Sequence, residues 1–224
     1  VGCEATIYAD IISTNDLTWS VNVNATHYKN EITKLPEGQP SIEYGAFQLE
    51  VGKSRYEYYS REFVGVNPNN GAALFYKDIL DDNGEPTGNR EITEDWTDAT
   101  EYFIGKSALP ELYGGFGTTI NYKNWGLGVS FAYQFGGYGR DNTYIELLSG
   151  EGGENYHNDI FNTWTVDNTD AELPLVVPNN DLNYYSTSNM RLIKSDFLSL
   201  QDINISYTFN NEIISKLGIT SARL

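Results

Sequence analysis

The sequence has few residues that support metal or covalent chemistry. Its 224 residues include one cysteine, Cys3, and two histidines, His27 and His157. A single cysteine excludes a disulfide framework within the chain and any cysteine-rich zinc site, and two histidines disfavour a structural zinc ion. The one methionine is Met190, and the chain opens on Val1 without a visible secretory signal. We therefore expect an internal piece of a longer protein.

Basic residues are also scarce. The chain carries 14 Lys and Arg against 31 Asp and Glu, for a formal net charge of -17. This charge repels polyanions, so nucleic acid is not expected as a partner, and a solvated acidic surface is favoured over a dedicated cation site. No window approaches the roughly 20 consecutive apolar residues of a membrane helix. Strands of a membrane barrel, however, hide their apolar residues by alternation.

Alternation is what the sequence does have, most clearly between Leu112 and Gly137. A tight turn at Lys123–Asn124 joins two arms of about ten residues each, the strand length that crosses an outer membrane. Gly, Ser, Ala and Gln occupy one face of the second arm, where a soluble sandwich would usually place Lys, Glu and Thr. The opposite face is apolar throughout: Trp125, Leu127, Val129, Phe131, Tyr133 and Phe135. The pattern predicts a hairpin of an outer-membrane β-barrel with a lipid-facing side.

The other alternating stretches extend this prediction to the whole chain. Gly2–Ile12 and Leu17–Lys29 predict a second hairpin, in which Trp19, Val21 and Val23 share a face. Phe197–Phe209 predicts another strand, with Ile203, Ile205 and Tyr207 on one side. The two long segments between these strands are expected to be irregular and extracellular, because barrels of this kind have short periplasmic turns and long outer loops.

The expected fold class is therefore all-β, part of a large antiparallel transmembrane β-barrel with long extracellular loops. Residues 1–224 would belong to one barrel domain. Its expected segments are hairpin 2–34, extracellular loop 35–109, hairpin 110–137, extracellular loop 138–195, strand 196–209, periplasmic turn 210–218 and the start of another strand at 219–224. A short helical turn ended by Gly218 is expected within the periplasmic turn.

Several motifs, ordered along nearly the whole chain, resemble one family. They include VGKSRYEYY at 51–59, FVGVNPNNGAALFY at 63–76, the IGKSALPELYGGFG entry to the hairpin at 104–117, the loop HNDIFNTWTVDNTDAELP at 157–174 and the late strand SDFLSLQDINISY at 195–207. In this order they resemble the C-terminal barrel portion of SusC/RagA-type TonB-dependent transporters of Bacteroidota outer membranes.

The resemblance implies a plugged barrel of about 22 strands, of which this chain would supply about six. The plug domain and the TonB-contacting segment would lie before Val1, and the last strands after Leu224. The implied function is energised import of oligosaccharides, with peptides second, across the bacterial outer membrane. The implied partners are a SusD-like surface lipoprotein, TonB through the absent N-terminal region, outer-membrane lipid and the oligomeric ligand. No cofactor is implied.

Aromatic and basic residues of the two long segments are the ligand-binding candidates, because aromatic rings stack on sugars and Arg donates hydrogen bonds to polar oligomers. These candidates are Tyr56, Tyr58, Arg61, Tyr138, Arg140, Tyr156, Trp164 and Tyr184. Packing of the loops on one another is the favoured role for most of the aromatics, and ligand stacking is expected for some of them. Tyr28 and the aromatic residues of the apolar faces are candidates for a girdle at the membrane boundary. The alternative for the whole chain is a soluble extracellular all-β glycan-binding or structural module.

Catalysis and metal binding are not expected. Carboxylate pairs such as Glu151 and Glu154 lie in turn-rich segments without a supporting motif. The acidic stretch 81–85 lacks the ligand spacing of an EF-hand and predicts a turn. We therefore assign no catalytic and no metal-ligating residue, and we do not expect an enzyme.

Overall fold

The computed structural model describes residues 1–149, 155–176, 188–210 and 214–224. The chain separates into two compact units. The sheet unit comprises 1–29, 109–137 and 195–224, and the loop unit comprises 30–108 and 138–194. No helix in the described part of the chain is long and apolar enough to cross a membrane.

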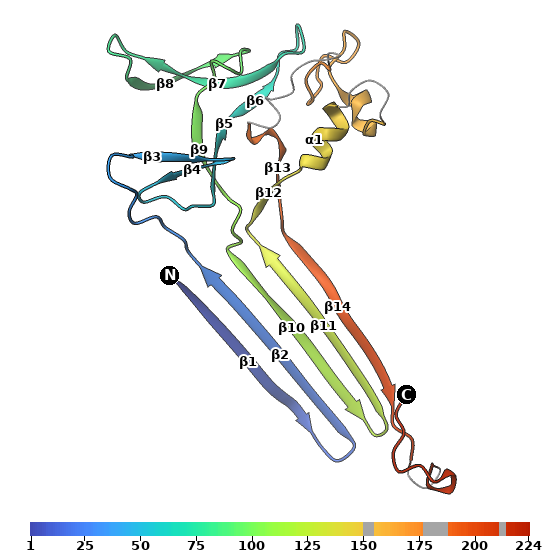
Figure 1. Cartoon of the computed structure of the whole chain (residues 1–224). Helices are drawn as coiled ribbons and strands as arrows, with labels where there is room; N and C mark the ends of the chain where they lie inside the picture. Colours follow the sequence, from blue (N-terminus) through green and yellow to red (C-terminus); the bar gives the residue numbers. More distant parts are fainter. Residues whose placement is uncertain (150–154, 177–187, 211–213) are drawn as a thin grey trace. The chain divides into compact units, whose positions relative to one another are not determined.

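The sheet unit is a single antiparallel sheet of five strands. Its strands are β1 (Gly2–Ser13), β2 (Leu17–Tyr28), β10 (Leu112–Tyr122), β11 (Trp125–Phe135) and β14 (Phe197–Tyr207), in the spatial order β1-β2-β10-β11-β14 (Figure 1). Each has 11 or 12 residues, enough for a tilted strand to cross a bilayer. The antiparallel barrel strands and both predicted hairpins are present, with Lys123 in the left-handed region at the tight turn.

The register of the sheet collects the apolar residues on one face. Val21, Thr118, Val129 and Ile203 lie opposite one another across four strands. The row two residues along repeats the pattern with Trp19, Ile120, Leu127 and Ile205. Exposure on this face is largest on β14, where Ile203 is 60% and Ile205 is 66% exposed. The sheet unit therefore exposes an apolar face that no described part of this unit covers.

The other face of the sheet carries small and polar residues. Asn22, Gly117, Ser130 and Asp202 form the row next to the one just described. Tyr28, a girdle candidate, lies opposite Gly2 and packs edge-on against Tyr113, with ring centroids 6.4 Å apart. Alternation along β2 places Tyr28 on the polar face with Asn24, and not on the apolar face with Val23. The girdle interpretation of Tyr28 is therefore wrong.

Two bulges shift the alternation, one inside β14 and one near the end of β1. The register between β11 and β14 shifts so that Leu200 lies opposite Phe131 and Leu198 opposite Tyr133. Strict alternation from Ile203 would have placed these leucines on the polar face. The extra residue in β14 therefore extends the apolar face along the whole strand. A similar shift in β1 brings Ile12, instead of Ile11, opposite Trp19.

The chain after β14 makes only short structure within the described residues. Residues Ser215–Leu217 form a 3₁₀ turn, and Gly218 follows it in the left-handed conformation, with φ 72°. Leu224 exchanges two backbone hydrogen bonds of 3.0 Å with Tyr207. In place of the strand expected at 219–224, the structure has this pair of hydrogen bonds and an isolated β-bridge between Thr208 and Arg223.

The loop unit is more regular than the sequence indicates. Its elements are β3 (Ser41–Tyr44), β4 (Phe47–Glu50), β5 (Glu57–Arg61), β6 (Phe63–Val66), β7 (Ala73–Leu80), β8 (Pro86–Thr93), β9 (Glu101–Ser107), β12 (Tyr138–Arg140), α1 (Asn142–Ser149), η1 (Asn158–Asn162), η2 (Asn189–Arg191) and β13 (Leu192–Lys194). They form sheets in the orders β3-β4-β5-β9, β6-β7-β8 and β12-β13. The irregular course expected for this region is wrong, because strands of three to eight residues are too short to show a clear period.

The loop unit has its own apolar core. Phe75, Ala73, Ala99 and Ile145 form a buried cluster, against which Phe63, Trp96 and Met190 pack. Phe75 is 1% exposed and its ring meets that of Phe63 at 5.9 Å. Burial of this kind is what a water-exposed domain needs to be stable.

Candidate functional site

The apolar face of the sheet keeps its few polar atoms hydrogen-bonded. The Trp19 indole nitrogen donates to the Thr118 hydroxyl at 2.8 Å, and that hydroxyl donates to the backbone oxygen of Ser20 at 3.2 Å. The Tyr133 hydroxyl donates to the backbone oxygen of Asn24 at 2.9 Å. Polar groups facing hydrocarbon must find partners within the protein, so this arrangement suits a face in contact with lipid.

Gly114 makes the Tyr133 contact possible. A Cβ at this position would lie 2.1 Å from the Asn24 backbone oxygen and 3.0 Å from the Tyr133 hydroxyl. The Asn24 side chain in turn accepts a hydrogen bond of 3.0 Å from the Gly115 backbone nitrogen. Glycine at 114 therefore provides the space through which the phenol of β11 reaches β2 across the strand between them.

Aromatic rings group at both ends of the same face. Trp125 and Tyr207 meet at 4.9 Å near the tight turn, and Tyr133 stacks on Phe135 at 5.6 Å at the other end of β11. Lys123 lies beside this first group, 5.4 Å from the Tyr122 ring. Amphipathic aromatic rings at both ends of membrane strands are typical of an interfacial girdle.

Three of the ligand-binding candidates come together in the loop unit. Tyr58 is buried, and its hydroxyl donates to the backbone oxygen of Tyr138 at 3.2 Å. Tyr58 and Arg140 line one cavity of about 240 Å³. Burial lowers the pKa of the Arg140 guanidinium. Burial also raises the pKa of the Tyr58 phenol, and the positive charge of Arg140 opposes that rise. A partly buried cation beside a buried phenol forms a polar site that is partly sheltered from bulk water.

Residues beyond the eight ligand-binding candidates complete this cavity. Its remaining lining consists of Gly45, Ala46, Tyr59, Ser60, Glu101, Ser188 and Leu192. Ser60 directly follows two tyrosines, and no sequence motif marks it. Ser60 becomes visible only when β5 is recognised as a strand, because Tyr58 and Ser60 are its two buried residues.

Arg61 lies beside the cavity without lining it. Its Nη1 atom is 2.5 Å from Glu101 Oε1, because the two residues are opposite each other in the β5–β9 register. Its guanidinium also lies 5.1 Å from the Trp96 ring. Arg61 therefore positions the Glu101 carboxylate at the cavity wall.

The remaining candidates do not join this group. Tyr56 packs on Phe47, with centroids 6.5 Å apart. Trp164 is buried against Gly71 and Leu175 and donates its indole N–H to the Pro68 backbone oxygen at 3.0 Å. Packing is thus the role that its surroundings give Trp164. Tyr156 is 40% exposed, and Tyr184 lies outside the described residues.

Cations cover several of the aromatic rings in this unit. Lys53 lies 4.5 Å from the Phe103 ring, Lys106 lies 5.2 Å from the Tyr138 ring and Arg191 lies 4.5 Å from the Tyr144 ring. Such contacts use the ring face that a sugar would otherwise stack on. The number of tyrosines in the sequence therefore overstates the stacking surface offered to a ligand.

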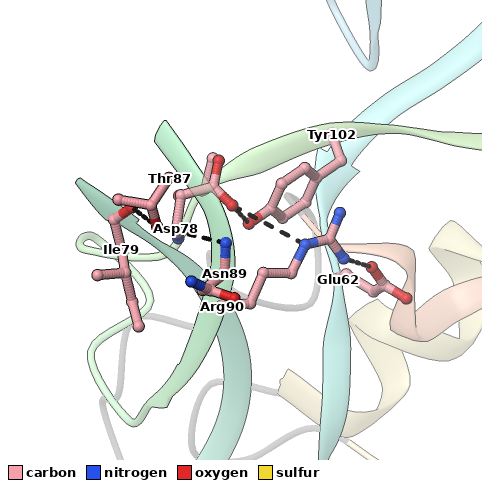
Figure 2. A network of polar contacts seen from close by, with 8 residues as sticks. Glu62, Asp78, Ile79, Thr87, Asn89, Arg90 and Tyr102 are labelled. Atoms are coloured by element: carbon pink, nitrogen blue, oxygen red, sulfur yellow. Dashed lines mark hydrogen bonds and ion pairs between the residues drawn. The ribbon is translucent and has the colours of Figure 1, made fainter. Parts of the chain in front are cut away.

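Arg90 organises a second polar network, also unmarked in the sequence (Figure 2). It lies 3.1 Å from Glu62 and 3.8 Å from Asp78, and its guanidinium lies 4.0 Å from the Tyr102 ring centroid. The Tyr102 hydroxyl donates to Asp78 at 2.7 Å. Burial and then this hydrogen bond raise the pKa of Tyr102. Since the members satisfy one another, the network serves to join β7, β8 and β9.

The acidic stretch after β7 forms a turn, as predicted. The Asp81 carboxylate accepts hydrogen bonds from the backbone nitrogens of Asn83 and Glu85, at 2.8 and 2.9 Å, and these bonds lower the pKa of Asp81. Among the residues that the structure describes, no group of three or more His, Cys, Asp or Glu side chains could hold a metal ion.

Comparison with known proteins gives relatives along nearly the full chain, although no protein-family model matches it. The chain is 26% identical over 246 residues to TonB-dependent receptor P3 of Formosa agariphila, covering 100% of the chain and 23% of that receptor. It is 25% identical over 213 residues to TonB-dependent receptor SusC of Bacteroides thetaiotaomicron, covering 94% of the chain and 20% of the relative. The chain thus spans less than a quarter of the length of these relatives.

Solved structures agree with the sequence matches. The structure of the RagAB peptide transporter superimposes with a TM-score of 0.83 at 24% identity, over 99% of this chain and 24% of that chain. The RagAB peptide importer in its "open-open" state gives a TM-score of 0.80 at 23% identity. At this identity the likeness concerns the fold, which is that of a transporter barrel.

The fold and the relatives define the class of protein: the chain corresponds to a portion of a TonB-dependent receptor. SusC and RagAB are among the proteins it is similar to, in agreement with the resemblance of the sequence motifs to the SusC/RagA family. The relatives bear names of receptors and transporters rather than of enzymes, which agrees with the expectation that the chain carries no catalysis.

Proposed function

We propose that this chain forms part of the wall and of the external loops of a TonB-dependent importer in a bacterial outer membrane. The five-stranded sheet carries the proposal, because one face is continuously apolar and exposed while the other is small and polar. A barrel wall that separates lipid from a polar lumen requires this division.

The orientation follows from the lengths of the connections. The turns at 13–16, 123–124 and 210–218 would face the periplasm, and the segments 35–109 and 138–195 would face the outside. An epitope inserted between Asp82 and Asn83, in the exposed turn between β7 and β8, should bind antibody on intact cells. The same epitope between Asn15 and Asp16 should bind only after permeabilisation, and the reverse result would contradict the orientation.

The proposed cargo is a neutral oligosaccharide, with a peptide as the second candidate. The net charge of -17 disfavours strongly anionic polymers. Hydroxyl and amide groups of the loop unit suit a neutral polar oligomer. The similarity to the RagAB peptide transporter supports the second candidate.

The proposed partners are a SusD-like surface lipoprotein, which would cover the external loops, and TonB, which would act through a part of the protein outside this chain. The similarity to SusC and to RagAB supports both partners. Purification of the complete protein from native membranes should retain a lipoprotein, and a preparation without one would contradict that part of the proposal.

A soluble extracellular all-β module is the alternative function, and the sheet argues against it. A soluble sandwich would cover its apolar face with a second sheet, whereas Ile203, Ile205 and Trp125 are all more than half exposed. Fractionation of cells that express the complete protein separates the two functions. We expect the protein in the outer-membrane fraction, and recovery in the soluble fraction would overturn the importer.

Uptake tests the activity itself. Cells with and without the gene would receive partial hydrolysates of starch, xylan and mannan, or a tryptic digest of casein. We expect the gene to be needed for uptake of a neutral oligosaccharide, and a protonophore to stop that uptake. A requirement for the gene only with the casein digest would reverse the order of the two cargo candidates.

A further inference from the structure

The cavity beside Tyr58 has features of a binding subsite, and this inference rests on the proposed import function. Five stretches distant in sequence form its walls: the turn between β3 and β4, β5, the start of β9, Arg140 of β12, and Ser188 with Leu192. Its volume of about 240 Å³ corresponds to about eight waters at roughly 30 Å³ each. A single ring of a polar oligomer is of this size.

Ser60 gives the cavity an unsatisfied polar group. Its side chain is 7% exposed, and its hydroxyl has no hydrogen-bond partner among the described residues. The Nε atom of the neighbouring Arg61 is likewise buried without a partner in the same described ranges. A buried polar group without a hydrogen bond costs free energy, which a bound ligand with its own polar groups would recover.

The other polar groups around the cavity are of both charge signs. Arg140 supplies donors, and Glu101, held by Arg61 at 2.5 Å, supplies acceptors. The Ser188 hydroxyl accepts a hydrogen bond of 3.3 Å from the Met190 backbone nitrogen and keeps its own hydrogen to donate. A ligand group with a net charge would meet a like charge on one wall, whereas adjacent hydroxyls can both donate to Glu101 and accept from Arg140.

We propose that this cavity binds one hydroxyl-bearing ring of the cargo, a neutral pyranose unit, through Ser60, Arg140 and Glu101. Tyr58 and Tyr59 supply apolar wall beside these polar groups. The subsite is assembled within the loop unit alone, so it exists independently of the barrel face.

Thiol protection in the complete transporter tests the subsite. Ser60→Cys would be introduced in a Cys3→Ser background, so that the reactive thiol of this chain lies in the cavity. Ser41→Cys, on the exposed strand β3 of the same unit, is the matched control. A small methanethiosulfonate reagent would label each variant with and without starch, xylan and mannan hydrolysates, or with and without a casein digest.

Titration calorimetry first identifies a neutral hydrolysate that the unsubstituted transporter binds. We expect this hydrolysate to slow labelling at position 60 by about tenfold and to leave the labelling rate at position 41 unchanged. Three results would overturn the subsite. These are no labelling at position 60, labelling that the bound hydrolysate leaves unchanged, and protection by the casein digest alone. If labelling is unchanged although the hydrolysate binds, the import function stands and only the subsite fails. If no hydrolysate binds, the glycan function fails and the pyranose subsite with it.

Arginine variants give a second measurement that does not depend on labelling. Arg140→Met keeps an unbranched stem but removes the guanidinium donors, and Arg55→Met removes the same charge from an exposed position. We expect Arg140→Met to weaken hydrolysate binding about tenfold or more, the effect of losing hydrogen bonds from a charged group, and Arg55→Met to change it less than about twofold. Equal losses in two folded variants would show a general charge effect and overturn the role of Arg140.

Discussion

The two units of this chain treat apolar residues in opposite ways. The loop unit has an interior core of large apolar side chains, as with Phe75 at 1% and Leu148 at 0% exposure. In the sheet unit they are outside, as with Leu200 at 52% and Ile205 at 66%, while the polar Ser206 is buried. The proposed importer accounts for this difference by two solvents: water around the loop unit, and hydrocarbon against the apolar face of the sheet.

Removing a large ring should therefore cost much more in the loop unit. Phe75→Ala would leave a cavity in the core and lower the free energy of unfolding of that unit by about 3–5 kcal/mol. The same change at Phe135, which is 46% exposed, should cost only about 1 kcal/mol, because lipid tails replace the ring and mainly its stacking on Tyr133 is lost. Hydrogen exchange of each unit in the complete transporter measures both effects. Equal costs would contradict the two-solvent interpretation.

The next largest effect should come from placing a charge on the sheet, because the stability cost should differ between its two faces. Val129→Lys puts an ammonium group on the apolar face, at a cost of about 2–4 kcal/mol near the bilayer midplane. Ser130→Lys, one residue along, puts it on the polar face opposite Asp202, where we expect less than about 1 kcal/mol.

Urea unfolding of the transporter in liposomes, together with the amount assembled in the outer membrane, compares these two variants. A larger loss for Ser130→Lys than for Val129→Lys would mean that the faces are assigned the wrong way round.

Glycine substitutions sharpen the comparison further. Gly114→Ala in the sheet unit would bring a Cβ to 2.1 Å from the Asn24 oxygen and disturb the Tyr133 hydrogen bond, so we expect a loss of about 1–3 kcal/mol. Gly139→Ala in β12 of the loop unit meets no atom within 4 Å and should be nearly neutral. Thermal unfolding of the two variants provides the test, and tolerance of Gly114→Ala would show that β2 and β10 can move apart.

The smallest expected effect is a pH dependence confined to the loop unit. The hydrogen bond from the Tyr144 hydroxyl, followed by smaller contributions including the nearby His157, lowers the pKa of Asp159 below its usual 3.8. A carboxylate with a lowered pKa contributes stability above its ordinary pKa, and the contribution is lost as the pH falls through the lowered value.

Amide exchange at His157–Asn162 should therefore stay slow down to about pH 4 and accelerate below it, while amides of β10 and β11 serve as the reference. Asp159→Asn should remove this step. A step that persists in the variant would assign it to another group.

The sequence by itself determined the two hairpins of the sheet. An alternation of period two fixes which side chains share a face, and a tight turn fixes which strands pair, so both hairpins and the apolar faces that carry Val21 and Val129 could be predicted. It did not determine where the alternation shifts. The bulge that turns Leu198 and Leu200 to the apolar face depends on pairing with β11, a strand more than 60 residues earlier in the chain.

Only the tertiary structure decided the organisation of the loop unit and its cavity. Its strands are short, and their stability comes from contacts between distant residues, which no local period reports. The sequence supplied Tyr58 and Arg140 as candidates, but their meeting around Ser60 and Glu101 requires β5, β9 and β12 to come together. It also could not tell Trp164, whose indole is buried against Gly71, from a ring open to ligand. Strand alternation is a local property of the backbone, whereas burial and cavity formation are properties of the folded chain.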